Sequence, residues 1–174
     1  MNTYKYSDYD YNINKKKILN ILIIDDDINV CTSLKLFLES RGHLVTTVQE
    51  GIRGISHFDN NLYDLLFIDF HLDNDVAPNI NKDNLNYVLD GSMVSELILN
   101  LKTNKKIIFG YTGDTSNIII NKFKDAGITG IIFKPFDPLI LSKLMNIIET
   151  TSDINSLNNI SKFKRNNILI FNNI

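Results

Sequence analysis

The feature that most constrains the fold of this chain is a regular alternation between short apolar runs and amphipathic stretches. Each run is rich in Ile, Leu, Val or Phe, which is typical of a strand buried on both faces of a sheet. The runs are Ile21–Ile24, Leu44–Val48, Leu65–Ile68, Ile107–Tyr111 and Gly130–Phe133. The alternation therefore predicts an α/β fold, with a parallel sheet that is covered by helices on both faces.

A helix is expected after each of these strands. In the first, Val30, Leu34 and Leu38 recur at helical spacing and so form one apolar face. The last is expected to begin at Asp137-Pro138, because Asp is a favoured N-cap and Pro fits the first helical position. Five such units predict a doubly wound, flavodoxin-like, five-stranded parallel sheet with five helices and the strand order 2-1-3-4-5.

The two ends of the chain differ from the alternating region. Residues 1–16 are mostly Tyr, Asn, Asp and Lys without an apolar period, so we interpret them as a flexible leader. Residues 17–149 form the expected domain. Residues 150–174 are rich in Asn and Ser and contain one short apolar run, Ile168–Phe171. This tail is too short to be an output domain of its own.

Composition and charge exclude several classes of protein. The net charge is −2, which implies no general attraction to nucleic acid. No apolar run approaches the ~20 residues that cross a bilayer, and the N-terminus lacks an apolar signal core. The single cysteine, Cys31, excludes an internal disulfide and is expected in the core, so a reduced, cytoplasmic setting is the default. His43 and His57 are expected on the surface.

Polar residues of complementary chemistry follow four of the predicted strands. They are Asp25, Asp26 and Asp27 after the first, Asp69 after the third, Thr112 after the fourth and Lys134 after the fifth. The first and third strands would be neighbours, so their carboxylates should converge at the edge where such sheets bind ligands. Carboxylates ~4 Å apart repel by roughly 4 kcal/mol, so the cluster needs a cation, and hard oxygen ligands favour Mg²⁺. A lysine and a hydroxyl nearby suit a phosphoryl group on a carboxylate.

With these residues the chain resembles the receiver domain of two-component response regulators, over roughly Lys17–Glu149. The motifs that carry the resemblance are Ile21–Asp27, Asp64–Asp69, Asp90-Gly91, Tyr111–Asp114 and Ala126–Phe136. Each motif is weak alone, but their order and spacing make the set specific. The resemblance implies a phosphoacceptor signalling domain, not a metabolic enzyme, which catalyses its own phosphorylation and dephosphorylation.

The resemblance also implies a role for each site residue. Asp69 would take the phosphoryl group, Lys134 would contact a phosphoryl oxygen, and Thr112 would turn toward the phosphoryl group. Asp26 would bind Mg²⁺ directly, Asp25 would bind it directly or through water, and the backbone carbonyl of His71 would complete the protein ligands. The Lys134-Pro135 bond is expected to be cis. Gly113, Asp114 and His71 would flank the path of the water that hydrolyses the phosphoryl group, and so modulate its lifetime.

Three departures from the family pattern are visible. Leu72-Asp73 stands where the family has Met-Pro. Asp90-Gly91 lies unusually far from Asp69, so residues 74–89 are interpreted as an insertion beside the site. The switch aromatic expected three residues before the lysine is replaced by Ile131, which puts the usual coupling between threonine and aromatic in doubt.

The leading hypothesis is a stand-alone response regulator that works through protein contacts. Its expected partners are a histidine kinase or histidine phosphotransfer protein and a downstream protein target, with a homodimer left open and neither nucleic acid nor membrane expected. One alternative is a receiver-like binding module that is not phosphorylated. Another is a haloacid dehalogenase-type phosphatase, which pairs its nucleophile with an Asp two residues later. Asp25 and Asp27 have that spacing, whereas His71 stands two residues after Asp69.

Overall fold

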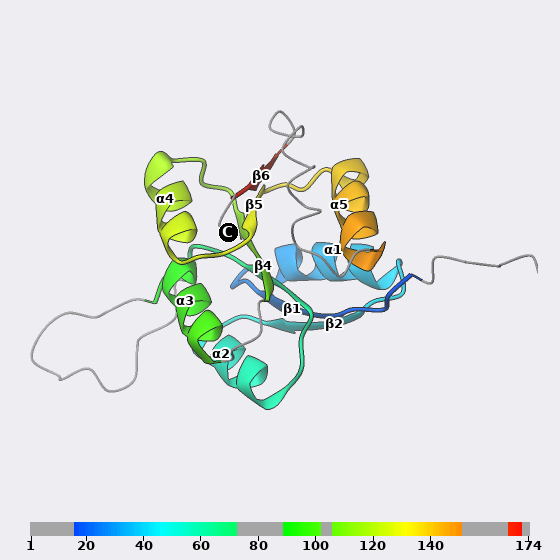
Figure 1. Cartoon of the computed structure of the whole chain (residues 1–174), viewed down its shortest axis with the longest axis horizontal. Helices are drawn as coiled ribbons and strands as arrows, with labels where there is room; N and C mark the ends of the chain where they lie inside the picture. The colour runs from blue at the N-terminus through cyan, green and yellow to red at the C-terminus, as the bar shows by residue number, and fades with distance from the viewer. Residues whose placement is uncertain (1–15, 73–88, 102–105, 151–166, 172–174) are drawn as a thin grey trace, which may run out of the picture.

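The computed structural model describes residues 16–72, 89–101, 106–150 and 167–171. Most of the predicted leader, almost all of the predicted insertion 74–89 and much of the tail lie outside these ranges. Within them the chain forms a single six-stranded sheet with helices on both faces (Figure 1). No helix in the described ranges is both long enough and apolar enough to cross a membrane.

The elements alternate between strand and helix up to the end of the last helix. The strands are β1 (Asn20–Ile24), β2 (Leu44–Val48), β3 (Leu65–Ile68), β4 (Ile107–Thr112), β5 (Gly130–Phe133) and β6 (Ile168–Ile170). The helices are α1 (Ile28–Glu39), α2 (Gly51–Asn60), α3 (Gly91–Leu101), α4 (Asn117–Asp125) and α5 (Pro138–Thr150). The sheet order is β2-β1-β3-β4-β5-β6, and β1 to β5 are parallel. The predicted flavodoxin-like fold with the order 2-1-3-4-5 is confirmed.

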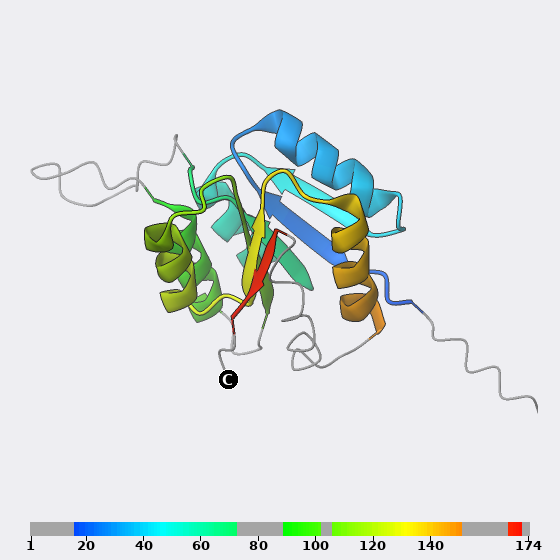
Figure 2. The same ribbon diagram turned by 90° about the horizontal axis from the view of Figure 1, so that it is seen from above.

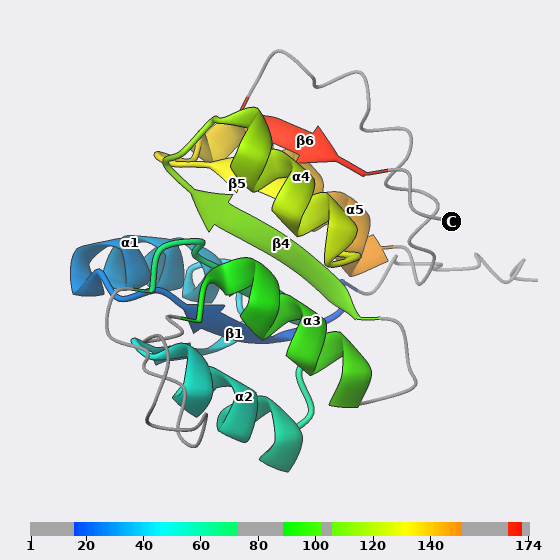
Figure 3. The same ribbon diagram turned by 90° about the vertical axis from the view of Figure 1, so that its left-hand side faces the viewer.

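Side-chain alternation along the strands divides the core into two layers. In β1, Ile21 and Ile23 pack with α1 and α5, whereas Leu22 and Ile24 pack with α2, α3 and α4. Figures 2 and 3 show these two groups of helices on opposite faces of the sheet. Burying one such side chain stabilises the fold by about 1.5–3 kcal/mol, which is why the sheet is almost wholly apolar up to its ends. Its polar residues are thereby concentrated at the strand ends.

Asp137 begins α5 as predicted. Its Oδ1 atom accepts hydrogen bonds from the backbone N–H groups of Leu139, at 2.8 Å, and Ile140, at 3.2 Å. Asp27 serves α1 in the same way, because its Oδ1 atom accepts from the N–H of Asn29 at 2.8 Å. These side chains satisfy helix donors that would otherwise lack partners. They also fix where α1 and α5 start, directly after β1 and close to the end of β5.

The sixth strand, β6, corrects the prediction of a five-stranded sheet. It lies antiparallel to β5, with Ile132 opposite Ile168 and Gly130 opposite Ile170 (Figure 2). A side chain at Gly130 would overlap the backbone carbonyl oxygen of Leu169, so glycine is what lets the two strands approach here. The short apolar run in the tail is therefore part of the sheet and closes the edge of β5.

A buried carboxylate, that of Glu149, connects several elements at the edge of the sheet that lies opposite the acidic residues. Glu149 of α5 is 3 % exposed, and its side chain contacts Lys16 at 2.6 Å, Arg41 at 2.9 Å and His43 at 2.9 Å. The prediction that His43 lies on the surface is wrong, because this imidazole is 4 % exposed. Its Nδ1 atom accepts from the N–H of Leu19 at 3.3 Å, so Nε2 carries the proton and donates to Glu149.

We expect Glu149→Gln to lower the free energy of unfolding by about 1–3 kcal/mol, because it weakens several charge-assisted hydrogen bonds in a buried setting. Burial raises the pKa of Glu149, but the hydrogen bonds from Lys16, Arg41 and His43 outweigh it and hold that pKa below its usual value. The stabilisation is thus present above the usual glutamate pKa and is lost as pH falls through the lowered one. Urea unfolding at several pH values measures both effects.

Glu39→Gln is the matched control, because Glu39 pairs with Lys35 at 3.6 Å on an exposed helix surface. Exposed pairs contribute little, so this change should leave the unfolding midpoint almost unmoved. Equal losses in the two variants would show that the buried network adds no more than an ordinary surface pair.

Candidate functional site

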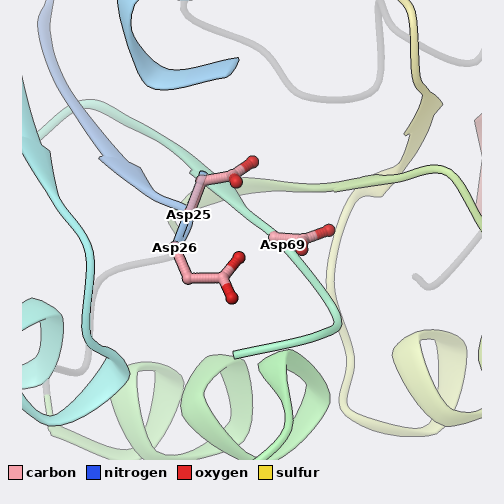
Figure 4. A group of neighbouring side chains, drawn as sticks. All are labelled: Asp25, Asp26 and Asp69. Atoms are coloured by element: carbon pink, nitrogen blue, oxygen red, sulfur yellow. The ribbon is translucent and has the colours of Figure 1, made fainter. Parts of the chain in front are cut away.

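The carboxyl ends of the central strands bring three carboxylates together. Asp25 and Asp26 directly follow β1, and Asp69 directly follows β3. Ile24 pairs with Ile68 in the parallel β1–β3 ladder, and the N–H of Asp69 donates to the carbonyl of Ile24 at 2.8 Å. Asp25 and Asp69 therefore leave neighbouring strands at the same level, and Figure 4 shows their side chains beside that of Asp26.

These carboxylates are close enough to share one cation. Each of Asp25, Asp26 and Asp69 offers an oxygen, and the three oxygens lie within 4.8 Å of one another. Asp25 and Asp69 are buried, while Asp26 is partly exposed and so lies on the solvent side. Closely spaced oxygen ligands with an open side suit Mg²⁺, which keeps several of its water molecules. The donor set thus fits the predicted metal.

Burial makes the cluster costly to ionise without a cation. It raises the pKa of Asp25 to about 6, an effect opposed by the hydrogen bond from Lys134 and reinforced by the charge of Asp69. Burial also raises the pKa of Asp69, although the Lys134 ammonium group opposes the shift. Because each buried carboxylate resists ionisation beside the other, any added positive charge is stabilised here.

Lys134 supplies one fixed positive charge to the cluster. Its Nζ atom lies 2.8 Å from Asp25 Oδ2 and 3.1 Å from Asp69 Oδ1, and it sits over the Tyr111 ring at 5.4 Å. Burial lowers the pKa of Lys134, but the two carboxylates outweigh it and raise that pKa above its usual value. The side chain therefore stays an ammonium group near Asp69. The Lys134-Pro135 peptide bond is cis, as expected.

Thr112, the last residue of β4, and Gly113, directly after it, form the next part of the site. The hydroxyl of Thr112 is buried and accepts from the N–H of Asp114 at 3.2 Å. A side chain at Gly113 would meet no atom within 4 Å, so the chain leaves open space there. The next residue, Asp114, lies against His71, with Oδ2 and Nε2 3.7 Å apart. The backbone N–H of Ser116, and to a lesser degree its hydroxyl and His71, hold the pKa of Asp114 below its usual value.

The Asp90-Gly91 pair returns to Asp69 despite its distance in the sequence. The N–H of Gly91 donates to the carbonyl of Phe70 at 2.8 Å, and a side chain at Gly91 would overlap the backbone carbonyl of Asp69. Asp90 accepts from Met93 N–H at 3.1 Å and from Lys122 Nζ at 2.9 Å. Sequence reasoning noted the motif but not this contact, since the spacing to Asp69 gave no sign of it. Glycine here lets α3 start directly against the backbone of Asp69.

Two residues near the cluster play no direct part in it. Asp27 turns its side chain to cap α1, so the Asp25/Asp27 pair does not form the paired carboxylates of a dehalogenase-type site. Cys31 is buried as predicted, and its Sγ atom donates to the carbonyl of Asp25 at 3.3 Å. Burial raises the pKa of this thiol to about 12, so it stays protonated and is a poor metal ligand.

Solved structures with this fold include several receiver proteins. A two-component response regulator from Clostridium difficile is 27% identical, with a TM-score of 0.60 over 75% of this chain and 94% of that one. A CheY-like receiver domain protein from Methanospirillum hungatei is 23% identical, with a TM-score of 0.63 over 76% of this chain and 94% of that one. The second likeness shows the fold alone.

Curated relatives include the transcription factor SKN7 of Candida albicans, which is 31% identical over 67% of this chain. The CAI-1 autoinducer sensor kinase/phosphatase CqsS of Vibrio cholerae is 28% identical over 70% of it. The matched regions make up only 18% and 16% of those two proteins, respectively. Residues 21–149 match the response regulator receiver domain family, and the chain therefore belongs to this family of two-component signalling domains.

Proposed function

We propose that this receiver domain is a phosphorylation switch in which Asp69 accepts a phosphoryl group from a phosphohistidine donor. The observation that carries the proposal is the meeting of three carboxylates within 4.8 Å beside the Lys134 ammonium group. One carboxylate acts as nucleophile, the others provide a cation site, and the lysine neutralises charge on the incoming group. Membership of the family implies a histidine kinase or a histidine phosphotransfer protein as the donor.

The reaction follows from the placement of these groups. A carboxylate oxygen of Asp69 attacks phosphorus in line, the P–N bond of the phosphohistidine breaks, and its electron pair returns to the imidazole, which takes up a proton. Asp25, Asp26, Asp69 and the backbone carbonyl of His71 would hold Mg²⁺, and the ion would supply charge neutralisation. Lys134 moves its contact from Asp69 to a phosphoryl oxygen, and the Thr112 hydroxyl donates to another.

The direct test is incubation of the whole chain with acetyl phosphate and Mg²⁺, followed by intact mass measurement. We expect the mass of one phosphoryl group to be added, and we expect chelation of Mg²⁺ to prevent the addition. A chain that gains no mass under conditions in which another receiver is labelled would contradict the proposal.

A second candidate function is a receiver-like binding module that is not phosphorylated. The observation that favours it is Ile131, which is fully buried at the position where the family has its switch aromatic. A buried aliphatic side chain cannot exchange between inward and outward positions as a signal. The acetyl phosphate experiment separates the two candidates, because only the switch requires labelling.

The contact between His71 and Asp114 leads to a prediction about how long the phosphoryl group stays on the protein. We expect Asp114→Ala to slow loss of the phosphoryl group severalfold, because in this proposal Asp114 orients the attacking water beside Gly113, where there is no side chain to exclude it. His71→Ala should also change the decay rate, because the Nε2 atom of His71 lies 3.7 Å from the Oδ2 atom of Asp114. The measurement is decay of labelled protein after the donor is removed.

Asp125→Ala is a suitable control, because this aspartate is exposed at the end of α4, away from the carboxyl ends of the strands. Its decay rate should match that of the wild type. Identical decay in wild type, Asp114→Ala and His71→Ala would show that neither residue takes part in the hydrolytic step.

A further inference from the structure

The strand that carries Lys134 at its end is held on both edges. On the inner edge β5 pairs with β4, and the N–H of Lys134 donates to the carbonyl of Thr112 at 2.8 Å. On the outer edge β5 pairs with β6, a strand from the C-terminal tail (Figure 2). Because β6 runs antiparallel, its first residues lie beside the last residues of β5. The start of β6 is thus the part nearest to the phosphorylation site.

Asn167 makes the contacts at that point. Its carbonyl accepts from the N–H of Phe133 at 2.8 Å, and its side-chain amide donates to the carbonyl of Pro135 at 3.5 Å. These are the residues directly before and after Lys134. Asn167 has a φ of 60°, a left-handed conformation that Asn adopts more readily than most residues. The tail therefore contacts the backbone on either side of the lysine.

Packing anchors β6 in both layers of the core. Ile168 is 5 % exposed and packs in the layer of α1 and α5, whereas Phe171 is 9 % exposed and packs in the layer of α2, α3 and α4. At the far end, the N–H of Phe171 donates to the carbonyl of Thr129 at 2.9 Å. A strand fixed at both ends and on both faces can hold the chain beside it in one position.

We propose that β6 is a positioning strand for the phosphorylation site, and that Asn167 together with the apolar anchors Ile168 and Phe171 sets where the Lys134 ammonium group lies. This inference rests on the proposed function. Lys134 must keep Nζ near both Asp25 and Asp69, at 2.8 and 3.1 Å, to meet the incoming phosphoryl group. A displacement of ~1 Å in such a group can lower a rate by about 10²-fold, so a support beside it matters.

The first test is Ile168→Asp in the full chain, which places a charge in the core under β6 and undocks it. We expect phosphorylation by acetyl phosphate to slow by about tenfold. Mg²⁺ affinity, measured by calorimetry, should be kept or raised, because the Lys134 ammonium group competes with the cation for Asp25 and Asp69. A general collapse of the site would instead lower the affinity for Mg²⁺.

Gly130→Ala tests the pairing of β5 with β6 from the β5 side, since a side chain at this position would overlap the backbone carbonyl of Leu169 in β6. We expect it to slow phosphorylation in the same way, while Ile168→Val, which keeps the apolar anchor, should behave as wild type. In a Lys134→Met background, Ile168→Asp should cause no further loss, because the strand acts through the lysine. A further loss of the same size in that background would overturn the inference.

Amide hydrogen exchange gives a readout that does not depend on phosphorylation. In Ile168→Asp we expect the Lys134 amide to exchange about tenfold faster, while the Asp69 amide, bonded to Ile24 inside the sheet, keeps its protection. If the wild type takes no phosphoryl group, the proposed function fails and the exchange experiment still decides this inference. Unchanged Lys134 exchange in both Ile168→Asp and Gly130→Ala would overturn it.

Discussion

Asp69→Asn is expected to abolish phosphorylation, with a loss of at least about 10³-fold in labelling by acetyl phosphate and Mg²⁺. The amide keeps the size of the carboxylate but lacks the negative oxygen that attacks phosphorus. It also replaces one of the three carboxylates that offer a cation site by a neutral amide. Intact mass spectrometry over time measures the rate, and fragmentation of labelled wild type should place the phosphoryl group on Asp69.

Asp27→Asn is the matched control for this experiment. Asp27 lies two residues after Asp25, but its side chain caps α1, and Asn is an equally good cap. We therefore expect labelling at the wild-type rate. Labelling of Asp69→Asn at that same rate would show that another residue is the acceptor, and Asp25 or Asp26 would be examined next.

The stability of the metal-free protein is expected to fall as pH rises through about 6. Burial raises the pKa of Asp25 from 3.8 to about 6, so the folded state holds a proton that the unfolded chain releases. The resulting stabilisation is full below the unfolded pKa and is lost as pH rises through the folded one. The difference amounts to stability on the order of 3 kcal/mol, since each pKa unit is worth about 1.4 kcal/mol.

Mg²⁺ should reverse this trend, because the cation replaces the proton and binds better to ionised carboxylates. At about 100 times its dissociation constant, Mg²⁺ should stabilise the fold by about 2.7 kcal/mol near pH 7, and by clearly less near pH 5. Thermal unfolding with and without Mg²⁺ at each pH measures the shift. Asp26→Ala should lose the gain from Mg²⁺, and Asp25→Asn should flatten the pH dependence of the metal-free protein.

The assignment of the cation site would be wrong if Asp26→Ala kept the full rise in melting temperature. If the stability of the metal-free protein does not change between about pH 5 and 7, the raised pKa of Asp25 would be contradicted, but the cation site would not. The two results are independent, because the first concerns the cation and the second concerns the proton.

Most of the sheet was predictable because each strand carries its own local signal. β3 begins and ends at the predicted residues, since its uninterrupted apolar run is buried on both faces of the sheet. Helix α4, one of the five helices expected after the strands, covers Asn117–Asp125 and is capped by Ser116. The site followed from the same reasoning, since Asp25, Asp26, Asp69 and Lys134 stand at the strand ends where the topology brings them together.

The features that escaped prediction depend on partners far away in the sequence. The run Ile168–Phe171 was visible, but nothing local indicates that it pairs with β5 across the whole of α5. His43 was expected at the surface because it lies near the end of a predicted helix, whereas its burial depends on Glu149, 106 residues later. The hydrophobic pattern of a segment indicates whether that segment is buried. It does not indicate which distant segment packs against it.

The return of Asp90-Gly91 to Asp69 has a consequence for how this protein can vary. Residues 73–88 are bounded by Leu72 and Leu89, both of which are buried, and just beyond them Gly91 is bonded to Phe70. Both attachment points are thus held by the core, independently of the length of the sequence between them. We therefore expect a reporter peptide placed between these two buried anchors to leave the acceptor residue in position, which makes this part of the chain a graft point for engineering.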